Sequence, residues 1–290
     1  MKQVLIVGPN SYLGSSLGAY LARFPESYQV STLSVRDDRW RETPLSAFDA
    51  IYYTAALVHR EQAKNDPSQA ERYDEINAVL PVAVAQKAEA EGVRQFVFLS
   101  TMAVYGLTAP YGKTVTITAQ TPLSPTDYYG QSKAKAERKL LALEDDGFRV
   151  AILRPPMIYG KGCKGNYQAL RAFAQKMPCF PKIGNGRSML YVGNLNRLVQ
   201  LLLDSGEGGI FCPQDGEYVD TGRMVQAIAR AQGRSLPLIP GFGWALSLLR
   251  HASPKIDKAF GSLRYDQTLS SFSQDYRVFS WEQAVRESEA

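Results

Sequence analysis

Tyr129 and Lys133 are the residues of this chain whose types and spacing could perform acid–base chemistry. They stand four positions apart, so a helix would place both side chains on one face, one turn apart. A tyrosine hydroxyl has a reference pKa of roughly 10, and a neighbouring cation lowers that pKa because it favours the phenolate. The pair is therefore predicted to move a proton to or from a substrate hydroxyl near neutral pH. The spacing alone is a weak motif, because a chain with 16 tyrosines contains such pairs by chance.

A hydroxyl residue at the end of a predicted strand adds weight to this pair. The apolar run over 94–100 predicts a buried strand that leads directly into Thr101. Ligands of open α/β sheets bind outside the carboxyl ends of the strands. Thr101 is therefore expected on the ligand side of the sheet, and a helix over 129–146 is expected to carry Tyr129 and Lys133.

The N-terminal stretch has the order of a dinucleotide-binding turn. Residues 3–7 predict a buried parallel strand, a glycine-containing turn follows, and a helical pattern continues to about residue 23. Backbone N–H groups at the start of such a helix can hold a pyrophosphate. A plain strand–helix turn is the alternative, because a serine stands where a middle glycine is expected. The predicted cofactor contacts in the turn are Gly8, Ser11, Tyr12, Leu13 and Gly14.

The end of the second predicted strand, over 28–35, bears on the choice of dinucleotide. Ser34 stands where NAD enzymes of this fold carry an acidic residue for the ribose 2′-hydroxyl. A serine does not repel a 2′-phosphate, and Arg36 could pair with that phosphate. The sequence therefore favours NADP slightly, while NAD stays open because Asp37 and Asp38 follow at once.

The next strand, predicted over 49–56, ends in Ala55 and Ala56. Small side chains at a strand's carboxyl end would let a cofactor pass, although ordinary core packing explains them equally well. The segment between the two strands is short. The strand and helix usual at this point are therefore expected to be abbreviated or absent.

The rest of the chain predicts alternating helices and strands. A helical pattern over 67–91 contains Pro81, which should kink the helix or split it in two. His59 is interpreted as a loop residue rather than a ligand, and the apolar segment 244–249 as a packed helix rather than a membrane-surface element. The charged tail after 282 is expected to fray. The other predicted elements are strands 148–153 and 210–212 and helices 166–177, 193–204 and 220–232.

Composition limits the class of protein. The 290 residues are 45% hydrophobic, which is ordinary for a globular chain, and the net charge of +5 is spread without a basic block. We expect no nucleic acid partner and no bound metal. We expect no signal peptide, and no apolar run is long enough to span a membrane. Cys163, Cys179 and Cys212 cannot all pair, so a reduced, cytoplasmic location is expected.

Taken together, these stretches resemble the extended branch of the short-chain dehydrogenase/reductase superfamily, which contains nucleotide-sugar epimerases and dehydratases. The resemblance extends over nearly the whole chain and is closest to the UDP-glucose 4-epimerase-like and 4-keto-sugar reductase subgroup. It departs at Ser11 and in the short segment after the second strand. The segments that carry the resemblance, in order, are 8–14, 49–56, Asn77, 99–101, 104–106, Tyr129 with Lys133, 154–155, 159–160, 165–166, 187–195, 261–263 and Trp281.

The resemblance implies roles for individual residues. Thr101 would bond the reacting sugar oxygen and Tyr129 would be the acid/base. Lys133 would lower the tyrosine pKa and hold the nicotinamide ribose. Pro155 would contact the cofactor, and Asn166 and Arg187 the nucleotide diphosphate of the substrate.

The resemblance also implies a fold and a function. We expect a doubly wound parallel α/β sheet over residues 1–160, with a small substrate lobe over 161–290 that returns some elements to the first domain. Dehydration is not expected, because Met102 and Ala103 stand where dehydratases carry an Asp-Glu pair. Redox chemistry at C4 of a UDP-hexose remains, with a 4-epimerase favoured, an NADPH-dependent 4-keto reductase as alternative and a non-catalytic dinucleotide sensor as a third. The expected assembly is a homodimer through the helices at 67–91 and 129–146.

Overall fold

The computed structural model describes residues 1–58, 66–241, 243 and 255–290. His59 and the segment 244–249 lie outside the described residues. The chain divides into two compact units, and each is described by itself. The first comprises Met1–Gly106, Pro122–Arg154 and Asn196–Cys212; the second comprises Leu107–Thr121, Pro155–Leu195 and Pro213–Ala290.

A six-stranded, all-parallel sheet forms the centre of the first unit, as the sequence predicted. Its order is β10-β6-β4-β3-β1-β2. The inner strands are almost continuously apolar, because a parallel sheet is covered on both faces. The strands are β1 (Lys2–Val7), β2 (Tyr28–Leu33), β3 (Ala50–Tyr53), β4 (Gln95–Leu99), β6 (Arg149–Leu153) and β10 (Gly209–Phe211).

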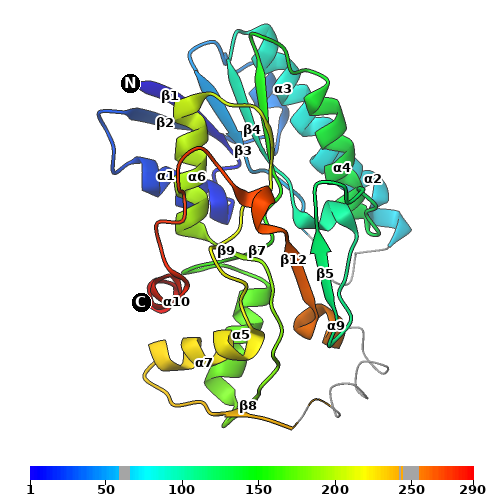
Figure 1. Ribbon diagram of the computed structural model, residues 1–290. Coiled ribbons are helices and arrows are strands. Elements are labelled where there is room, and N and C mark those ends of the chain that lie inside the picture. The colour runs from blue at the N-terminus through cyan, green and yellow to red at the C-terminus, as the bar shows by residue number, and fades with distance from the viewer. Residues whose placement is uncertain (59–65, 242, 244–254) are drawn as a thin grey trace. The chain divides into compact units, whose positions relative to one another are not determined.

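Helices cover both faces of this sheet. Helix α1 (Tyr12–Leu21) and the part of α6 (Val192–Ser205) that belongs to this unit lie on one face, and α3 (Leu80–Ala90) and α4 (Tyr128–Leu141) on the other (Figure 1). Alternate strand residues such as Phe96, Phe98 and Ile152 form the buried core under α3 and α4. Helix α4 ends five residues before the predicted end at 146.

Among the described residues, no strand pairs with the outer edge of β2. The usual doubly wound order is 3-2-1-4-5-6, and here β2 is the edge. The fully described segment between β2 and β3 contains a single regular element, the 3₁₀ helix η1 (Asp38–Arg41). The expectation of an abbreviated segment is thus confirmed.

Pro81 changes the hydrogen-bond pattern of its helix without opening a gap. The helical run comprises η3 (Pro67–Gln69), α2 (Ala70–Asp74), the π-helical turn η4 (Glu75–Val79) and α3. Proline has no N–H to donate four residues back, and the N–H of Leu80 bonds the carbonyl of Glu75, five residues back. The π turn therefore accommodates Pro81 in the first turn of α3.

The second unit contains short parallel strand pairs that the sequence did not predict. Its helices over 166–176 and 221–231 were predicted, whereas those over 255–260 and 281–289 were not. The pairs are β5 (Thr114–Ile117) with β12 (Ser262–Tyr265), β7 (Met157–Tyr159) with β9 (Met189–Tyr191), and β8 (Phe180–Pro181) with β11 (Leu238–Ile239). The helices are α5 (Asn166–Lys176), α7 (Thr221–Ala231), α9 (Lys255–Phe260) and α10 (Trp281–Glu289).

The expectation of a fraying C-terminal tail is wrong. Ser280 and Gln283 form a reciprocal capping box at the start of α10. Near its end, the carboxylate of Glu289 bonds Tyr167 and pairs with Arg171 at 2.8 Å. The helix is therefore fixed at both ends, although Glu282, Arg286 and Glu287 are exposed. Within the described part of the chain, no helix is long and apolar enough to cross a membrane.

Candidate active site

At two positions of the turn after β1, only glycine fits without a steric clash. Gly8 has φ of +98°, and a Cβ there would lie 2.7 Å from the backbone nitrogen of Ala55. A Cβ at Gly14 would lie 2.8 Å from the carbonyl oxygen of Gly8. Both positions therefore require glycine, and the backbone of the turn stays open at the N-terminus of α1. This is the cradle that a pyrophosphate needs.

Ser11 has a structural task in this turn. It is the N-cap of α1, and its hydroxyl accepts the N–H of Gly14 at 2.9 Å. The same hydroxyl lies 2.6 Å from that of Thr54, which in turn donates to the carbonyl of Val7 at 3.0 Å. A serine in place of a middle glycine thus fastens the turn to the end of β3. Tyr12 and Leu13 then supply the first helical N–H groups, which have no intrahelical acceptor in any α-helix.

Tyr129 lies in the first turn of α4, part-buried and close to the end of β4. Burial raises the pKa of Tyr129 to about 12, and the carboxylate of Asp127, the N-cap of α4, acts in the same direction. A side-chain hydrogen bond from Thr101 opposes them. At neutral pH Tyr129 is therefore a protonated phenol, positioned beside Thr101.

The predicted effect of Lys133 on Tyr129 is not found. Lys133 is 2% exposed, and its Nζ donates to the carbonyl of Leu99 at 2.8 Å and lies 4.4 Å from the ring centroid of Phe98. Burial lowers the pKa of Lys133 to about 7, and Glu137 acts against this shift. The lysine is thus bound to the strand instead of the tyrosine, and the prediction that it lowers the pKa of Tyr129 is corrected.

Three consecutive residues from the end of β4 onward contact three successive turns of α4, although not in the same order. Leu99, Ser100 and Thr101 contact Lys133, Glu137 and Tyr129 respectively. The three helix residues are four apart and therefore lie on one face. The structure thus brings the predicted Thr101, Tyr129 and Lys133 together and adds Glu137, which we missed. Glu137 follows Lys133 by four residues, as Lys133 follows Tyr129, and this repeated spacing in the sequence could have indicated it.

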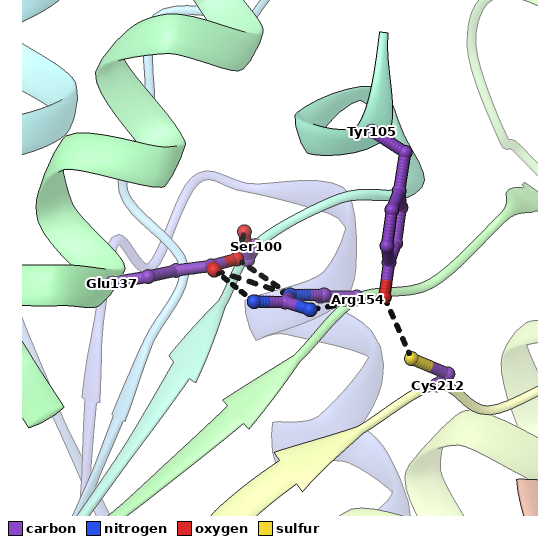
Figure 2. Close-up of polar contacts among 5 residues, drawn as sticks. All are labelled: Ser100, Tyr105, Glu137, Arg154 and Cys212. Carbon is purple, nitrogen blue, oxygen red and sulfur yellow. Dashed lines mark hydrogen bonds and ion pairs between the residues drawn. The ribbon is translucent and has the colours of Figure 1, made fainter. Parts of the chain in front are cut away.

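Figure 2 shows that Glu137 belongs to a buried polar cluster. Arg154, the residue after β6, binds both carboxylate oxygens of Glu137 through Nε and Nη2, the latter at 2.6 Å. Its Nη1 donates to the hydroxyl of Tyr105 at 2.9 Å, and that hydroxyl lies 3.7 Å from the sulfur of Cys212. The hydroxyl of Ser100 donates to Glu137. The cluster joins the carboxyl ends of β4 and β6 to α4.

Asn77 performs a similar joining task from the π-helical turn. Its side-chain amide pairs with both backbone groups of Leu57, at 2.8 and 3.1 Å, and its nitrogen donates to the hydroxyl of Ser132 at 3.2 Å. The fully buried amide therefore connects the segment after β3 to α4.

At the edge strand, β2 ends at Leu33, so Ser34 is the first residue beyond it. Asp37 pairs with Arg39 at 2.6 Å and Asp38 with Arg41 at 3.0 Å. Arg36 is exposed and has no ion-pair partner among the described residues. Both acids that could have acted as an NAD-type carboxylate are thus engaged locally, while the guanidinium of Arg36 stays available. Beyond the end of β3 and Thr54, Ala55 and Ala56 are part-buried.

The predicted substrate contacts belong to the second unit. Asn166 is exposed in the first turn of α5, after Gly165, whose φ is +91°. Arg187 forms an antiparallel bridge with Val219, and its Nη1 donates to the carbonyl of Lys258. Burial lowers the pKa of Arg187. Pro155, the first residue of the segment Pro155–Leu195 of this unit, is buried. Roles for these residues stay predictions.

A buried carboxylate that sequence reasoning missed organises the second unit. Asp215 accepts the hydroxyl of Tyr159 at 2.9 Å, the N–H of Tyr191 at 3.1 Å and the amide of Asn194 at 2.8 Å. Burial raises the pKa of Asp215 to about 6, although these donors act against the shift. It therefore ties β7, β9 and the start of α6 together.

Comparisons with known proteins agree with the observed fold. A family model described as the NAD dependent epimerase/dehydratase family matches residues 4–203. The UDP-glucose 4-epimerase of Vibrio cholerae is 30% identical over 234 residues, which are 78% of this chain and 70% of that protein.

Solved structures share the fold at lower identity. The structure of RMD from Pseudomonas aeruginosa complexed with NADPH matches with a TM-score of 0.76 and 19% identity, covering 99% of this chain and 98% of that one. UDP-glucuronic acid 4-epimerase from Bacillus cereus in complex with NAD matches with a TM-score of 0.73 and 15% identity, covering 99% and 95%.

Proposed function

Because this chain belongs to the NAD dependent epimerase/dehydratase family, we propose that it catalyses redox chemistry at C4 of a UDP-linked hexose, as a 4-epimerase. The observation that carries the proposal is the alignment of Thr101, Tyr129 and Lys133 at the carboxyl end of β4. The Vibrio cholerae relative, a UDP-glucose 4-epimerase, supports the choice of C4 and of a UDP sugar.

The turn fits a nicotinamide dinucleotide. The steric limits at Gly8 and Gly14 leave a backbone cradle that a Cβ would fill, and the N-terminus of α1 favours a pyrophosphate there. When bound, NAD(P) supplies hydride transfer. The protein's own part is to orient the sugar and to handle the proton of the C4 hydroxyl.

Each predicted site residue has its own task in proton transfer or in ligand binding. Thr101 bonds the C4 oxygen, and Tyr129 exchanges the proton with it. Lys133, held by the carbonyl of Leu99 in a buried position, presents its ammonium group to the nicotinamide ribose. Asn166 and Arg187 bind the diphosphate of the sugar nucleotide. Because an epimerase must both accept and return the proton, Tyr129 has to act as base and as acid in one cycle.

Two observations favour the second candidate, an NADPH-dependent reductase of a UDP-4-keto sugar. A raised pKa makes Tyr129 a proton donor at neutral pH, and a ketone being reduced needs a proton. In addition, Ser34 and the available Arg36 suit a 2′-phosphate, so we propose a preference for NADP over NAD. A dissociable NADPH suits a one-way reduction better than epimerisation.

We also propose that the protein works as a homodimer through α3 and α4, in polysaccharide biosynthesis in the cytoplasm. Val79 in the π-helical turn is 38% exposed, which offers an apolar side chain for such a helix pairing.

One experiment separates the candidates. Purified protein is incubated with UDP-glucose, UDP-N-acetylglucosamine and their 4-keto-6-deoxy forms, and the products are analysed by NMR. A C4 epimer formed without net cofactor consumption supports the 4-epimerase. Stoichiometric oxidation of NADPH with a keto sugar supports the reductase. Cofactor binding with no product from any of these substrates would instead support a non-catalytic sensor.

A further inference from the structure

We propose that the buried ion pair of Glu137 and Arg154 sets the charge of Lys133, with Glu137 favouring the ammonium form and Arg154 opposing it. The inference rests on the proposed function, in which Lys133 belongs to the active site. It assigns a charge-setting role to two buried residues outside the proposed substrate and cofactor contacts.

The geometry leaves Lys133 dependent on Glu137. Its ammonium group bonds the carbonyl of Leu99 and faces the ring of Phe98, and neither of these carries a full negative charge. Glu137, one turn further along the same face of α4, is 1% exposed. A carboxylate in such an unscreened position acts strongly on a neighbouring charge.

The protonation state of Lys133 is sensitive to small changes in its surroundings. Burial lowers its pKa to about 7, and Glu137 is the group that acts against this shift. A lysine with a pKa near the working pH changes its protonation state when one neighbouring charge is lost. The charge of Glu137 thus decides how much ammonium is present.

Arg154 limits the influence of Glu137. Arg154 is 7% exposed, and its guanidinium holds both carboxylate oxygens. A buried ion pair is weak evidence for stability, because desolvation offsets much of the attraction. The position of Glu137 one turn from Lys133 offers another reason for the pair, since two opposite charges modulate a third charge more gently than a lone carboxylate does.

Apart from the capping carboxylate of Asp127 and the part-buried Glu89, the other ionisable groups around α4 are phenols, are paired elsewhere or are exposed. Lys135 pairs with Asp74 of α2 at 2.6 Å, and Asp127 caps α4. On the elements packed against α4, Lys87 of α3 pairs with Glu91, and Arg149 of β6 lies 3.6 Å from Glu144. The remaining groups on α4 and these elements are the phenols of Tyr73, Tyr105, Tyr128 and Tyr129, the part-buried Glu89, and the exposed Glu71, Arg72, Glu75, Arg138 and Lys139.

The test is a direct titration of Lys133. Protein labelled with ¹³Cε-lysine is titrated by NMR, and the signal of Lys133 is assigned with the Lys133→Arg variant. Glu137→Gln should lower the titration midpoint by about one pH unit or more, because the favourable charge is lost and Arg154 is left unopposed. Arg154→Met should raise the midpoint, whereas Arg154→Lys, which keeps the charge, should restore it toward the wild-type value.

These opposite shifts distinguish the proposal from a purely structural role. A midpoint in Glu137→Gln equal to that of the wild type, or shifts of the same sign in Glu137→Gln and Arg154→Met, would overturn it. Asp74→Asn is the matched control, because it removes a carboxylate that pairs with α4 two residues from Lys133 and should leave the midpoint unchanged.

Titration of a double variant and a turnover assay of the wild-type protein keep the proposal testable. If Glu137→Gln does not fold, the double variant Glu137→Gln/Arg154→Met leaves no unpaired buried charge, and its midpoint should still lie below the wild-type value; an unchanged midpoint again overturns the proposal. The titration needs no substrate. Failure of the wild-type protein to turn over any sugar nucleotide would therefore overturn the proposed function and not this result.

Discussion

The Nζ of Lys133 donates a hydrogen bond of 2.8 Å to the carbonyl oxygen of Leu99, two residues before Thr101. This bond fixes the height of α4 against the end of β4. It places the hydroxyl of Tyr129 beside that of Thr101 and directs Glu137 to Ser100. The alignment of the predicted catalytic residues thus depends on a lysine bound to the strand.

Replacing Tyr129 by phenylalanine should abolish turnover while cofactor binding remains. The loss of one acid/base group typically lowers the rate by about 10²- to 10⁴-fold. Tyr128→Phe is the matched control, because the neighbouring hydroxyl lies on another face of α4. Steady-state rates and cofactor titrations test this; a Tyr129→Phe rate within a few-fold of wild type would refute the assignment.

Thr101→Val should reduce kcat more than it raises KM, because a hydroxyl aimed at the reacting oxygen acts most in the transition state. Thr101 also caps η5 (Met102–Tyr105), so the variant should lose about 1 kcal/mol of stability. Thr101→Ser keeps both hydrogen bonds and should keep most of the activity. An unchanged kcat with a raised KM would make Thr101 a binding residue instead.

The stability of the protein should depend on the charge of Lys133. Its native pKa of about 7 is lower than the value of roughly 10.4 expected when unfolded. Between these values the unfolded chain binds more protons, so the free energy of unfolding should rise with pH, by about 3 kcal/mol from pH 7 to 9.5.

Lys133→Met should remove this rise, and urea unfolding at pH 6 and 9.5 measures it. Relative to wild type, the free energy of unfolding of Lys133→Met should therefore be highest below pH 7. Lys135→Met, which alters a half-exposed lysine of the same helix, should leave the pH dependence in place. Parallel pH curves for wild type and Lys133→Met would contradict the prediction.

Arg36→Ala should weaken NADPH binding about tenfold or more and leave NADH binding unchanged, because only NADPH carries the 2′-phosphate. Arg41→Ala is the control, since its guanidinium already pairs with Asp38. Fluorescence titration of apo-protein with both cofactors measures the effect. Tighter binding of NADH, unaffected by Arg36→Ala, would show that the preference is for NAD and would favour the epimerase.

Asp215→Asn should destabilise the second unit by about 1–3 kcal/mol, because an amide group would be turned toward donors that need an acceptor. The exposed Glu217→Gln change should have little effect. Urea denaturation compares the two variants, and equal stability would show that the donors around Asp215 find other acceptors.

The sequence by itself determined the α/β framework. Its apolar runs predicted each strand of the parallel sheet, because strands buried on both faces must be apolar throughout. The bounds agree within about two residues except at the end of β3, which was predicted at residue 56 and lies at Tyr53. It also predicted that Tyr129 and Lys133 share one face of a helix, since helical spacing is a local property. The lack of a regular strand between β2 and β3 followed from the shortness of the segment that joins them.

Tertiary structure decided what those residues contact. Lys133 bonds Leu99 instead of lowering the pKa of Tyr129, because burial against β4 offers a carbonyl within reach. The pairing of Glu137 with Arg154 joins residues 17 positions apart in sequence, and Ser11 with Thr54 joins residues 43 apart. Such contacts arise from the order of strands in the sheet, and no local pattern in the sequence encodes that order.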